Sequence, residues 1–265
     1  MAERSPFPDE EGVRLEEDEK VVEAIVLAAL LKLTSRSPAS VRRAYSNGTL
    51  PDLIQQLINQ FKVNLDSTLT TLVATANYGS RVTVDRLESY LGGDIAITPE
   101  DIDYILERNI NDILDSTNTS IELVQLEDSE TASNVLPFVI GLNTNQAKKL
   151  INYFKATQGK QKLENIERTL SRMRDEALTY RASLISVSLT EDVLEEGKLV
   201  AANQIQSGMN STLYKTWNCS FINSCQVCIG LHGETVPINS AFSAGLYRPK
   251  AHPHCHCALT ISEGA

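Results

Sequence analysis

The chain has 265 residues, of which 42% are hydrophobic, and its formal net charge is −10. This composition is sufficient for a sizeable core and argues against a surface that binds nucleic acid all over. The first 20 residues carry eight acids and three bases, the opposite of the basic start of a secretory signal. The longest apolar run, Ala24–Leu31, is far shorter than the roughly 18–20 residues that cross a bilayer. We therefore expect a soluble protein that is made in a cytoplasm and needs no membrane.

The N-terminal half is predicted to contain a tail and a helical region. Residues 1–16 are acidic and contain prolines, so they can bury little surface and should form a mobile tail. Residues 17–140 carry mainly helical spacing of apolar side chains. Within them, Thr98 and Pro99 are followed by two acids, and this order favours a helix start. The segment 117–140 fits either a helix or a strand.

Residues 141–208 are predicted to form a helical hairpin and a following helix. Asn143 or Asn145 can cap the first helix, and the Gln-Gly step at 158–159 can make the turn. The second helix carries apolar residues at alternating spacings of three and four, the heptad pattern of a packing seam. These residues are Leu163, Ile166, Leu170, Met173, Ala177, Tyr180 and Leu184. We expect the seam to pack against the first helix, either as a coiled coil or as an ordinary core-facing stripe.

A further helix is predicted to begin at Ser188-Leu-Thr-Glu191, where hydroxyl and carboxylate can satisfy each other's free backbone amides. It should end at Ser207-Gly208. The remaining residues, 209–265, are rich in turn-forming residues and contain every cysteine. We therefore place the boundary between a helical body and a Cys/His-rich end near Gly208.

The predicted hairpin is unusually basic. Nine Lys and Arg and four Asp and Glu lie between Asn145 and Arg181, a net charge of +5 within a chain of −10. Such a surface is either a solvated helix face balanced by acids elsewhere, or a contact for nucleic acid or an acidic partner. The candidate contacts for nucleic acid are Lys148, Lys149, Arg172 and Arg174.

All five cysteines fall in the last 47 residues. They are Cys219, Cys225, Cys228, Cys255 and Cys257. A secreted disulfide-rich domain would spread its cysteines and carry a signal, whereas clustering in an intracellular chain indicates a metal, with zinc as the first candidate. Cys219 stands apart from the others and is predicted to be a small buried residue.

Two short turns have the spacing to hold one metal ion. Cys225-x-x-Cys228 and His252-x-x-Cys255 each place two soft ligands three residues apart. Cys225, Cys228 and Cys255 are the leading ligands, and the fourth is either His252 or Cys257. A filled shell of four ligands makes a structural zinc rather than a catalytic one. The alternative is a set of reduced thiols without metal, or a disulfide formed in an oxidising medium.

One pair of residues suggests catalysis. His232-Gly-Glu234 lies close to the Cys-x-x-Cys, like the H-x-E of zinc nucleobase deaminases, but those enzymes place the H-x-E before the cysteine pair. The sequence has no P-loop, no nucleophile elbow and no dinucleotide fingerprint. A zinc-dependent hydrolase or deaminase is therefore an alternative for which no complete catalytic constellation is present.

These patterns predict a mainly α-helical protein. A helical body with a helical hairpin should be followed by a small C-terminal α+β subdomain. That subdomain has little core of its own, so we expect the zinc knuckle to give it its shape.

Several C-terminal motifs follow one another in a fixed order. They are Arg181 with Ile185–Glu191, Lys215-Thr-Trp217, Cys225-x-x-Cys228-x-x-Leu231-x-Gly233, Pro237 and His252-Pro-x-Cys255-x-Cys257. In this order they resemble the Mu F-like head morphogenesis family, the minor head proteins of tailed bacteriophages, over the last 90 or so residues. The chain departs from that family at His254 and His256, where Asn and Arg are usual, and it lacks the Pro-Pro often found before the histidine.

The resemblance implies a virion component, present in few copies in the head near the portal vertex and assembled in the host cytoplasm. Its implied partners are the portal protein and the major capsid or scaffold protein, with DNA as a further one. We therefore expect a phage minor head protein that has a structural zinc site and acts by binding rather than by catalysis. A DNA-binding virion protein that uses the basic patch is a third hypothesis.

Overall fold

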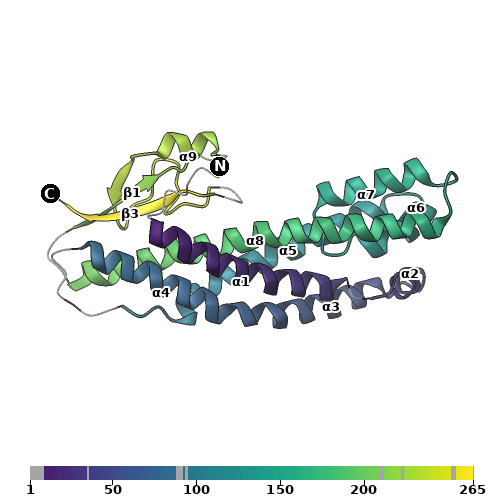
Figure 1. Cartoon of the computed structure of the whole chain (residues 1–265), viewed down its shortest axis with the longest axis horizontal. Coiled ribbons are helices and arrows are strands. Elements are labelled where there is room, and N and C mark those ends of the chain that lie inside the picture. The colour runs from purple at the N-terminus through teal and green to yellow at the C-terminus, as the bar shows by residue number, and fades with distance from the viewer. Residues whose placement is uncertain are drawn as a thin grey trace. The chain divides into compact units, whose positions relative to one another are not determined.

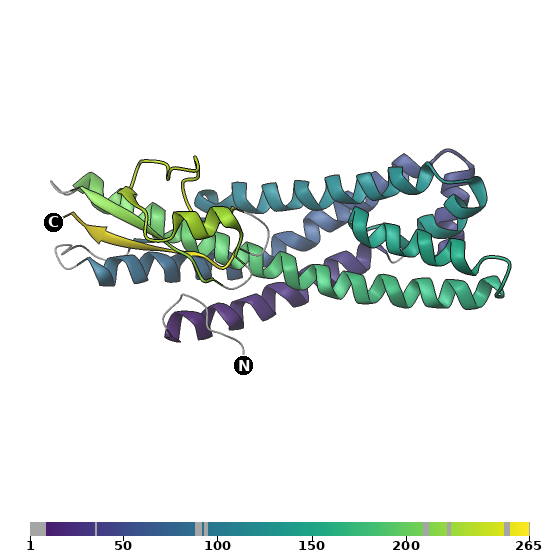
Figure 2. The same cartoon turned by 90° about the horizontal axis from the view of Figure 1, so that it is seen from above.

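A computed structural model describes residues 9–34, 36–87, 92, 95–208, 212–221, 224–251 and 255–264, with side chains described from residue 14 onwards. The described chain is mainly helical and carries one small antiparallel sheet (Figures 1 and 2), which confirms the predicted fold class. Among the described residues no single helix is long and apolar enough to cross a membrane, although one bent pair, 14–33 with 38–46, passes by length and composition.

The elements follow one another in this order. They are α1 (Asp9–Leu33), α2 (Pro38–Ser46), α3 (Leu50–Leu65), the 3-10 turn η1 (Asp66–Thr68), α4 (Leu69–Arg86), α5 (Pro99–Gln125), α6 (Ser129–Val135), η2 (Leu136–Phe138), α7 (Thr144–Thr157), α8 (Leu163–Gly208), β1 (Leu213–Asn218), α9 (Gln226–Leu231), β2 (Thr235–Pro237) and β3 (Ala258–Glu263). The ambiguous start of segment 117–140 is helical, because α5 continues to Gln125.

The chain forms two compact units, each built from separated stretches. The hairpin unit comprises residues 23–67 and 107–185. The sheet unit comprises the described residues of 1–22, 68–106 and 186–265. The predicted boundary near Gly208 is therefore wrong, because the last part of α8 belongs to the same unit as the cysteine-containing end.

Two predicted helix starts are confirmed, and both depend on local hydrogen bonds. Before α5, the Asp101 carboxylate accepts from the Thr98 backbone N–H at 2.8 Å and from its hydroxyl at 2.9 Å. Before α7, the Asn143 side chain accepts from the Gln146 N–H, and the Gln146 side chain accepts from the Asn143 N–H, each at 3.0 Å. Asn143 is thus the cap, in a reciprocal capping box.

The predicted mobile tail is wrong from Asp9 onwards, where α1 begins; residues 1–8 lie outside the described part of the chain. Leu15 is buried, and Asp18 accepts a hydrogen bond of 2.8 Å from the Thr75 hydroxyl of α4. Arg14 pairs with Asp18 one turn along the helix. Individual buried residues therefore anchor this acidic stretch in the core. The prediction failed because it used the average composition of the stretch and not its single residues.

The helical hairpin of α7 and α8 lies in the hairpin unit (Figure 2), where the Gln146 side chain donates to the Ala177 carbonyl oxygen at 2.9 Å. The predicted heptad seam is confirmed for some of its residues and wrong for others. Leu170 is buried, but Tyr180 is 63% exposed, and Leu178 and Ala182 are buried in its place. A straight helix has 3.6 residues per turn, so its buried face drifts away from a strict seven-residue repeat.

Arg181 is a buried charged residue of the hairpin unit. Its guanidinium is buried, and it donates to the carbonyl oxygens of Gly141 and Ile113 and to the Ser116 hydroxyl. Burial lowers the pKa of Arg181 to about 10, so the group stays charged at neutral pH. One side chain therefore ties α8 to α5 and to the loop before α7.

We expect Arg181→Ala to lower the free energy of unfolding by about 2–4 kcal/mol, because it leaves buried acceptors without donors. Arg168→Ala is the control on the same helix: its side chain is exposed, and its pairing with Glu164 should contribute less than about 1 kcal/mol. The measurement is denaturant unfolding followed by circular dichroism. Equal stabilities of the two variants would contradict the role given to Arg181.

The sheet unit carries a three-stranded antiparallel sheet with the order β2-β1-β3 (Figure 1). The central strand β1 pairs along its whole length with β3, from Leu213 opposite Glu263 to Asn218 opposite Ala258. Alternate residues of β1 point into the core, so Leu213, Lys215 and Trp217 are buried.

The Lys-x-Trp motif supplies two of these core residues. The Trp217 ring meets Phe242 edge to face, with centroids 5.2 Å apart. The Lys215 ammonium lies 5.5 Å from the centroid of Phe242 and 5.3 Å from that of Tyr247. Burial lowers the pKa of Lys215 to about 8, and the charge of Glu196 opposes this shift.

Helices α4 and α8 touch backbone to backbone in the sheet unit. A Cβ atom placed on Gly197 would lie 2.0 Å from the Ala76 carbonyl oxygen, and one on Gly79 would lie 2.3 Å from the Leu194 carbonyl oxygen. Only glycine permits such an approach. The two glycines therefore set how closely α8 lies to α4. Gly197 directly follows the stretch 191–196 of α8, whose acidic residues contact the C-terminal segment.

Helix α8 runs without interruption through Ser188–Glu191, so the predicted helix start there is wrong. Neither proline nor glycine breaks the chain at this point, and Thr190 donates to the Ser186 carbonyl oxygen at 2.9 Å as a residue inside a helix does. Glu191 is buried and faces the C-terminal segment. Glu191, the carboxylate of the predicted capping box, therefore contacts His256 instead of a backbone amide at a helix start.

Candidate metal centre

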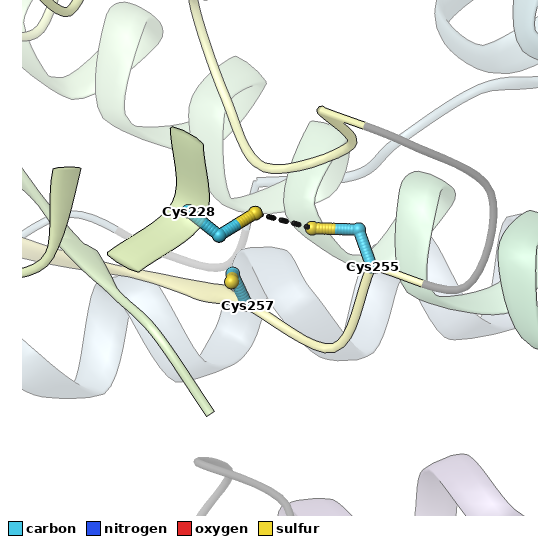
Figure 3. Close-up of side chains that lie close together, drawn as sticks. All are labelled: Cys228, Cys255 and Cys257. Atoms are coloured by element: carbon cyan, nitrogen blue, oxygen red, sulfur yellow. Dashed lines mark hydrogen bonds between the residues drawn. The ribbon is translucent and has the colours of Figure 1, made fainter. Parts of the chain in front are cut away.

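Three thiols meet in the core of the sheet unit. Cys228, Cys255 and Cys257 are buried, and their sulfur atoms all lie within 4.8 Å of one another (Figure 3). The Cys228 and Cys255 sulfurs are 3.6 Å apart. Cys228 comes from α9, whereas the other two come from the segment that leads into β3. We call these three residues the cysteine group.

Helix α9 brings Cys228 into the group. Cys225 is the N-cap of this short helix, and its sulfur accepts from the Cys228 backbone N–H at 3.4 Å. Cys225 is only half-buried and lies outside the 4.8 Å group, although its side chain contacts that of Cys228. Of the two sulfurs of the Cys-x-x-Cys motif, that of Cys225 therefore caps the start of α9, and that of Cys228 belongs to the cysteine group.

The structure brings together part of the predicted ligand set. Cys228 and Cys255 were leading candidates, and Cys257, one of the two candidates for the fourth position, joins them. Cys225 is adjacent to the group rather than in it. His252 lies outside the described residues. Cys219 is buried, as predicted, and accepts from the Phe221 backbone N–H at 3.4 Å.

The three thiols share protons unequally. Hydrogen bonding from Cys257 lowers the pKa of Cys255, and the same interaction raises the pKa of Cys257. Burial raises the pKa of Cys228. A soft metal cation that takes the place of the thiol protons would compensate the negative charge that burial disfavours.

Acidic residues of α8 hold the segment that carries Cys255 and Cys257. The Glu191 carboxylate lies 2.6 Å from Nδ1 of His256, which stands between the two cysteines. The Glu195 carboxylate accepts from the Leu259 backbone N–H at 2.7 Å. Both acids are buried, so their hydrogen bonds fix the segment firmly.

The preceding loop is fixed to the same helix by ion pairs. Lys250 contacts Asp192 at 2.5 Å, and Arg248 contacts both Asp192 and, at 2.8 Å, Glu196. Arg248 also donates to the Tyr104 hydroxyl at 3.2 Å. The sequence reasoning missed these contacts. The available signal was a pair of complementary runs, acids at 191, 192, 195 and 196, and bases and histidine at 248, 250 and 256.

The Glu191–His256 contact shifts both partners. Burial raises the pKa of Glu191 to about 7, and the hydrogen bond from His256 opposes this shift. The hydrogen bond to Glu191 raises the pKa of His256. The second carboxylate oxygen of Glu191 has no hydrogen-bond partner among the described residues. Glu191 lines, together with Cys255 and Cys257, a cavity of about 10 Å³, which has room for about one water molecule.

We expect Glu191→Gln to weaken metal binding by about 10- to 100-fold, because residues that orient ligands are needed for affinity. Glutamine keeps the size of the side chain but loses the charge-assisted bond to His256. Competition with a chromogenic chelator measures the affinity. Glu234→Gln, on a carboxylate outside the group, is the matched control, and equal affinities in both variants would rule out this role for Glu191.

The donor set suits a thiophilic metal. Three thiols are soft ligands of the kind that zinc sites use, and two of them are held by hydrogen-bonded neighbours in the way that metal ligands require. Among the described residues no carboxylate joins the three sulfurs within 4.8 Å, which disfavours magnesium or calcium. The cysteine group can therefore bind a metal ion.

The H-x-E pair has structural contacts instead of a place in the group. Nδ1 of His232 accepts from the Cys219 backbone N–H at 3.1 Å, and its ring meets Phe221 edge to face. Glu234 accepts from the backbone N–H and the hydroxyl of Ser243, each at 2.7 Å. These contacts hold two loops and bring neither residue to the cysteine group.

The four candidate contacts for nucleic acid lie in the hairpin unit. Lys148 and Lys149 are exposed on α7. On α8, Arg172 pairs with Glu176 at 3.8 Å and Arg174 with Asp175 at 2.8 Å. The two arginines are thus partly neutralised by their own helix, which weakens the basic surface that the sequence suggests.

The site is built from residues that approach one another from α8, α9 and the segment before β3. In comparisons with known proteins, no family model, no curated protein and no solved structure matches this chain.

Proposed function

We propose that the protein is a minor head protein of a tailed bacteriophage, which acts near the portal vertex during head assembly in the host cytoplasm. Its partners are the portal protein and the major capsid or scaffold protein. The observation that carries the proposal is the cysteine group itself. Through Cys228, Cys255 and Cys257 it joins two of the motifs on which the resemblance to the Mu F-like family rests, Cys225-x-x-Cys228 and Cys255-x-Cys257, and these motifs are far apart in the sequence.

Other family-like residues support the same proposal. Lys215 and Trp217 are buried in the central strand of the sheet. Glu191, the end of the Leu-Thr-Glu step, contacts His256 between two cysteines. The motifs therefore belong to one folded core, as expected for a unit that is inherited together.

The metal we propose is zinc, held by Cys228, Cys255 and Cys257, with His252 or Cys225 as the candidates for a fourth ligand. Bound zinc would add folding free energy to a segment that is already held by buried charges and by the apolar core of the sheet unit. The protein then acts by binding, since the cavity beside the thiols has room for about one water molecule and not for a substrate.

Purified particles of the phage or prophage that encodes the chain test this function. We expect the protein in mature heads at few copies, bound to the portal protein after mild disassembly, and fewer filled heads when its gene is deleted. Absence from both proheads and mature heads, with normal head yield after deletion, would contradict the proposal. The double variant Lys148→Glu/Lys149→Glu tests the DNA-binding hypothesis. If heads form normally with this variant but the protein no longer binds DNA, that hypothesis is favoured instead.

A further inference from the structure

One pair of sulfurs in the cysteine group joins two separate parts of the chain. Cys228 lies in α9, and Cys255 lies 27 residues further on, yet their sulfur atoms are only 3.6 Å apart (Figure 3). A disulfide needs about 2.05 Å between its sulfurs. The remaining distance, about 1.5 Å, is within the reach of side-chain rotation at two residues.

We propose that Cys228 and Cys255 are a site of reversible oxidation, at which a peroxide forms a disulfide in the metal-free protein. This inference goes beyond the proposed function and does not depend on it. It assigns one pair among the five cysteines, all of which are free thiols in the structure.

The neighbouring cysteines are placed less well for this reaction. The Cys225 sulfur accepts from a backbone N–H at the start of α9, so it is engaged at the helix end. Cys255 and Cys257 are separated by a single residue, and a bridge between them would close a very small ring. That residue, His256, is also held by Glu191 at 2.6 Å, which opposes the twist such a ring requires.

The chemistry balances with a peroxide as the oxidant. The thiolate of one cysteine attacks the peroxide oxygen, which breaks the O–O bond and gives a sulfenic acid and one water molecule. The second thiol then displaces the sulfenic oxygen as water and forms the S–S bond. Two thiols and one hydrogen peroxide molecule thus give one disulfide and two water molecules.

A metal ion and the disulfide compete for the same sulfurs. Thiolates that bind a metal cannot also form the bridge, so oxidation of the loaded protein should release the ion. The bridge would tie α9 to the segment before β3, the same two parts of the sheet unit that the metal joins. The core could therefore stay closed after the ion is lost.

The test uses the full chain, freed of metal by a chelator, with one equivalent of hydrogen peroxide. We expect titratable thiols to fall from five to three, peptide mapping without reductant to link the peptides of Cys228 and Cys255, and dithiothreitol to restore five thiols. Cys225→Ser should still form the bridge, and Cys255→Ser should not. In the metal-loaded chain, released metal should rise in step with the bridge.

Mapping of the unmodified chain keeps the test decisive if a variant fails to fold. A link between Cys225 and Cys228, or between Cys255 and Cys257, would overturn the assignment, and so would five thiols that survive the peroxide. A bridge that forms while the metal stays bound would overturn the competition. None of these results depends on whether the protein enters phage heads.

Discussion

Cys228→Ser is expected to leave the chain without stoichiometric metal and to lower its melting temperature by on the order of 10 °C or more. Serine removes one of three soft ligands and leaves a buried hydroxyl beside two thiols. The proposed metal would link α9 to the segment before β3, so its loss should loosen the sheet unit first. Elemental analysis of reduced, freshly purified protein and calorimetry would measure both effects.

The matched control is Cys219→Ser. Cys219 is also buried, but it contacts the Phe221 backbone and His232 instead of the cysteine group. We expect this variant to keep its metal and most of its stability. Should Cys228→Ser fail to fold, titration of the unmodified chain with a chelator provides the same comparison. An unmodified protein that is folded and free of transition metal would contradict the zinc proposal.

Gly197→Ala is expected to lower the free energy of unfolding by about 3 kcal/mol or more. The added Cβ would lie 2.0 Å from the Ala76 carbonyl oxygen and 2.9 Å from its Cα, and the obstacle is backbone, which cannot rotate away. Helices α4 and α8 must therefore move apart. The intrinsic helix preference of alanine, about 1 kcal/mol, offsets only part of this cost.

Gly208→Ala on the same helix is the control, since its Cβ would meet nothing within 4 Å. We expect this variant to be as stable as the parent or slightly more so. In the double variant Gly79→Ala/Gly197→Ala, the losses should not add, because helices that have separated for one Cβ also accommodate the other. Denaturant unfolding of the parent chain, the single variants Gly79→Ala, Gly197→Ala and Gly208→Ala, and the double variant measures this, and an additive or neutral result would contradict the close helix packing.

Local signals in the sequence predicted local structure well. The start of α5 after Thr98 and the capping box of Asn143 and Gln146 depend on atoms within four residues of each other, and both are present. The fold class also followed from the spacing of apolar residues, because most of the chain shows the three- and four-residue spacing of amphipathic helices. The position of Cys228 and Cys255 in one site was likewise anticipated from ligand spacing.

Features that depend on distant residues were not predictable in the same way. Ser188–Glu191 has the pattern of a helix start, but the choice between cap and helix interior depends on His256, more than sixty residues away. The choice of Cys257 over Cys225 depends on how α9 begins, since the Cys225 sulfur caps the first turn of that helix. Similarly, the face that α8 buries shifts with its true helical period, which a seven-residue template does not reproduce.

The segmented make-up of the two units constrains the order of events on the ribosome. The hairpin unit needs residues from 23–67 and from 107–185, and the sheet unit needs residues on both sides of these stretches. Neither unit can therefore close while only the first third of the polypeptide has been made. The nascent chain must carry α1 to α4 with partly open apolar faces until α8 emerges, and early helices of this kind are the natural clients of chaperones during translation.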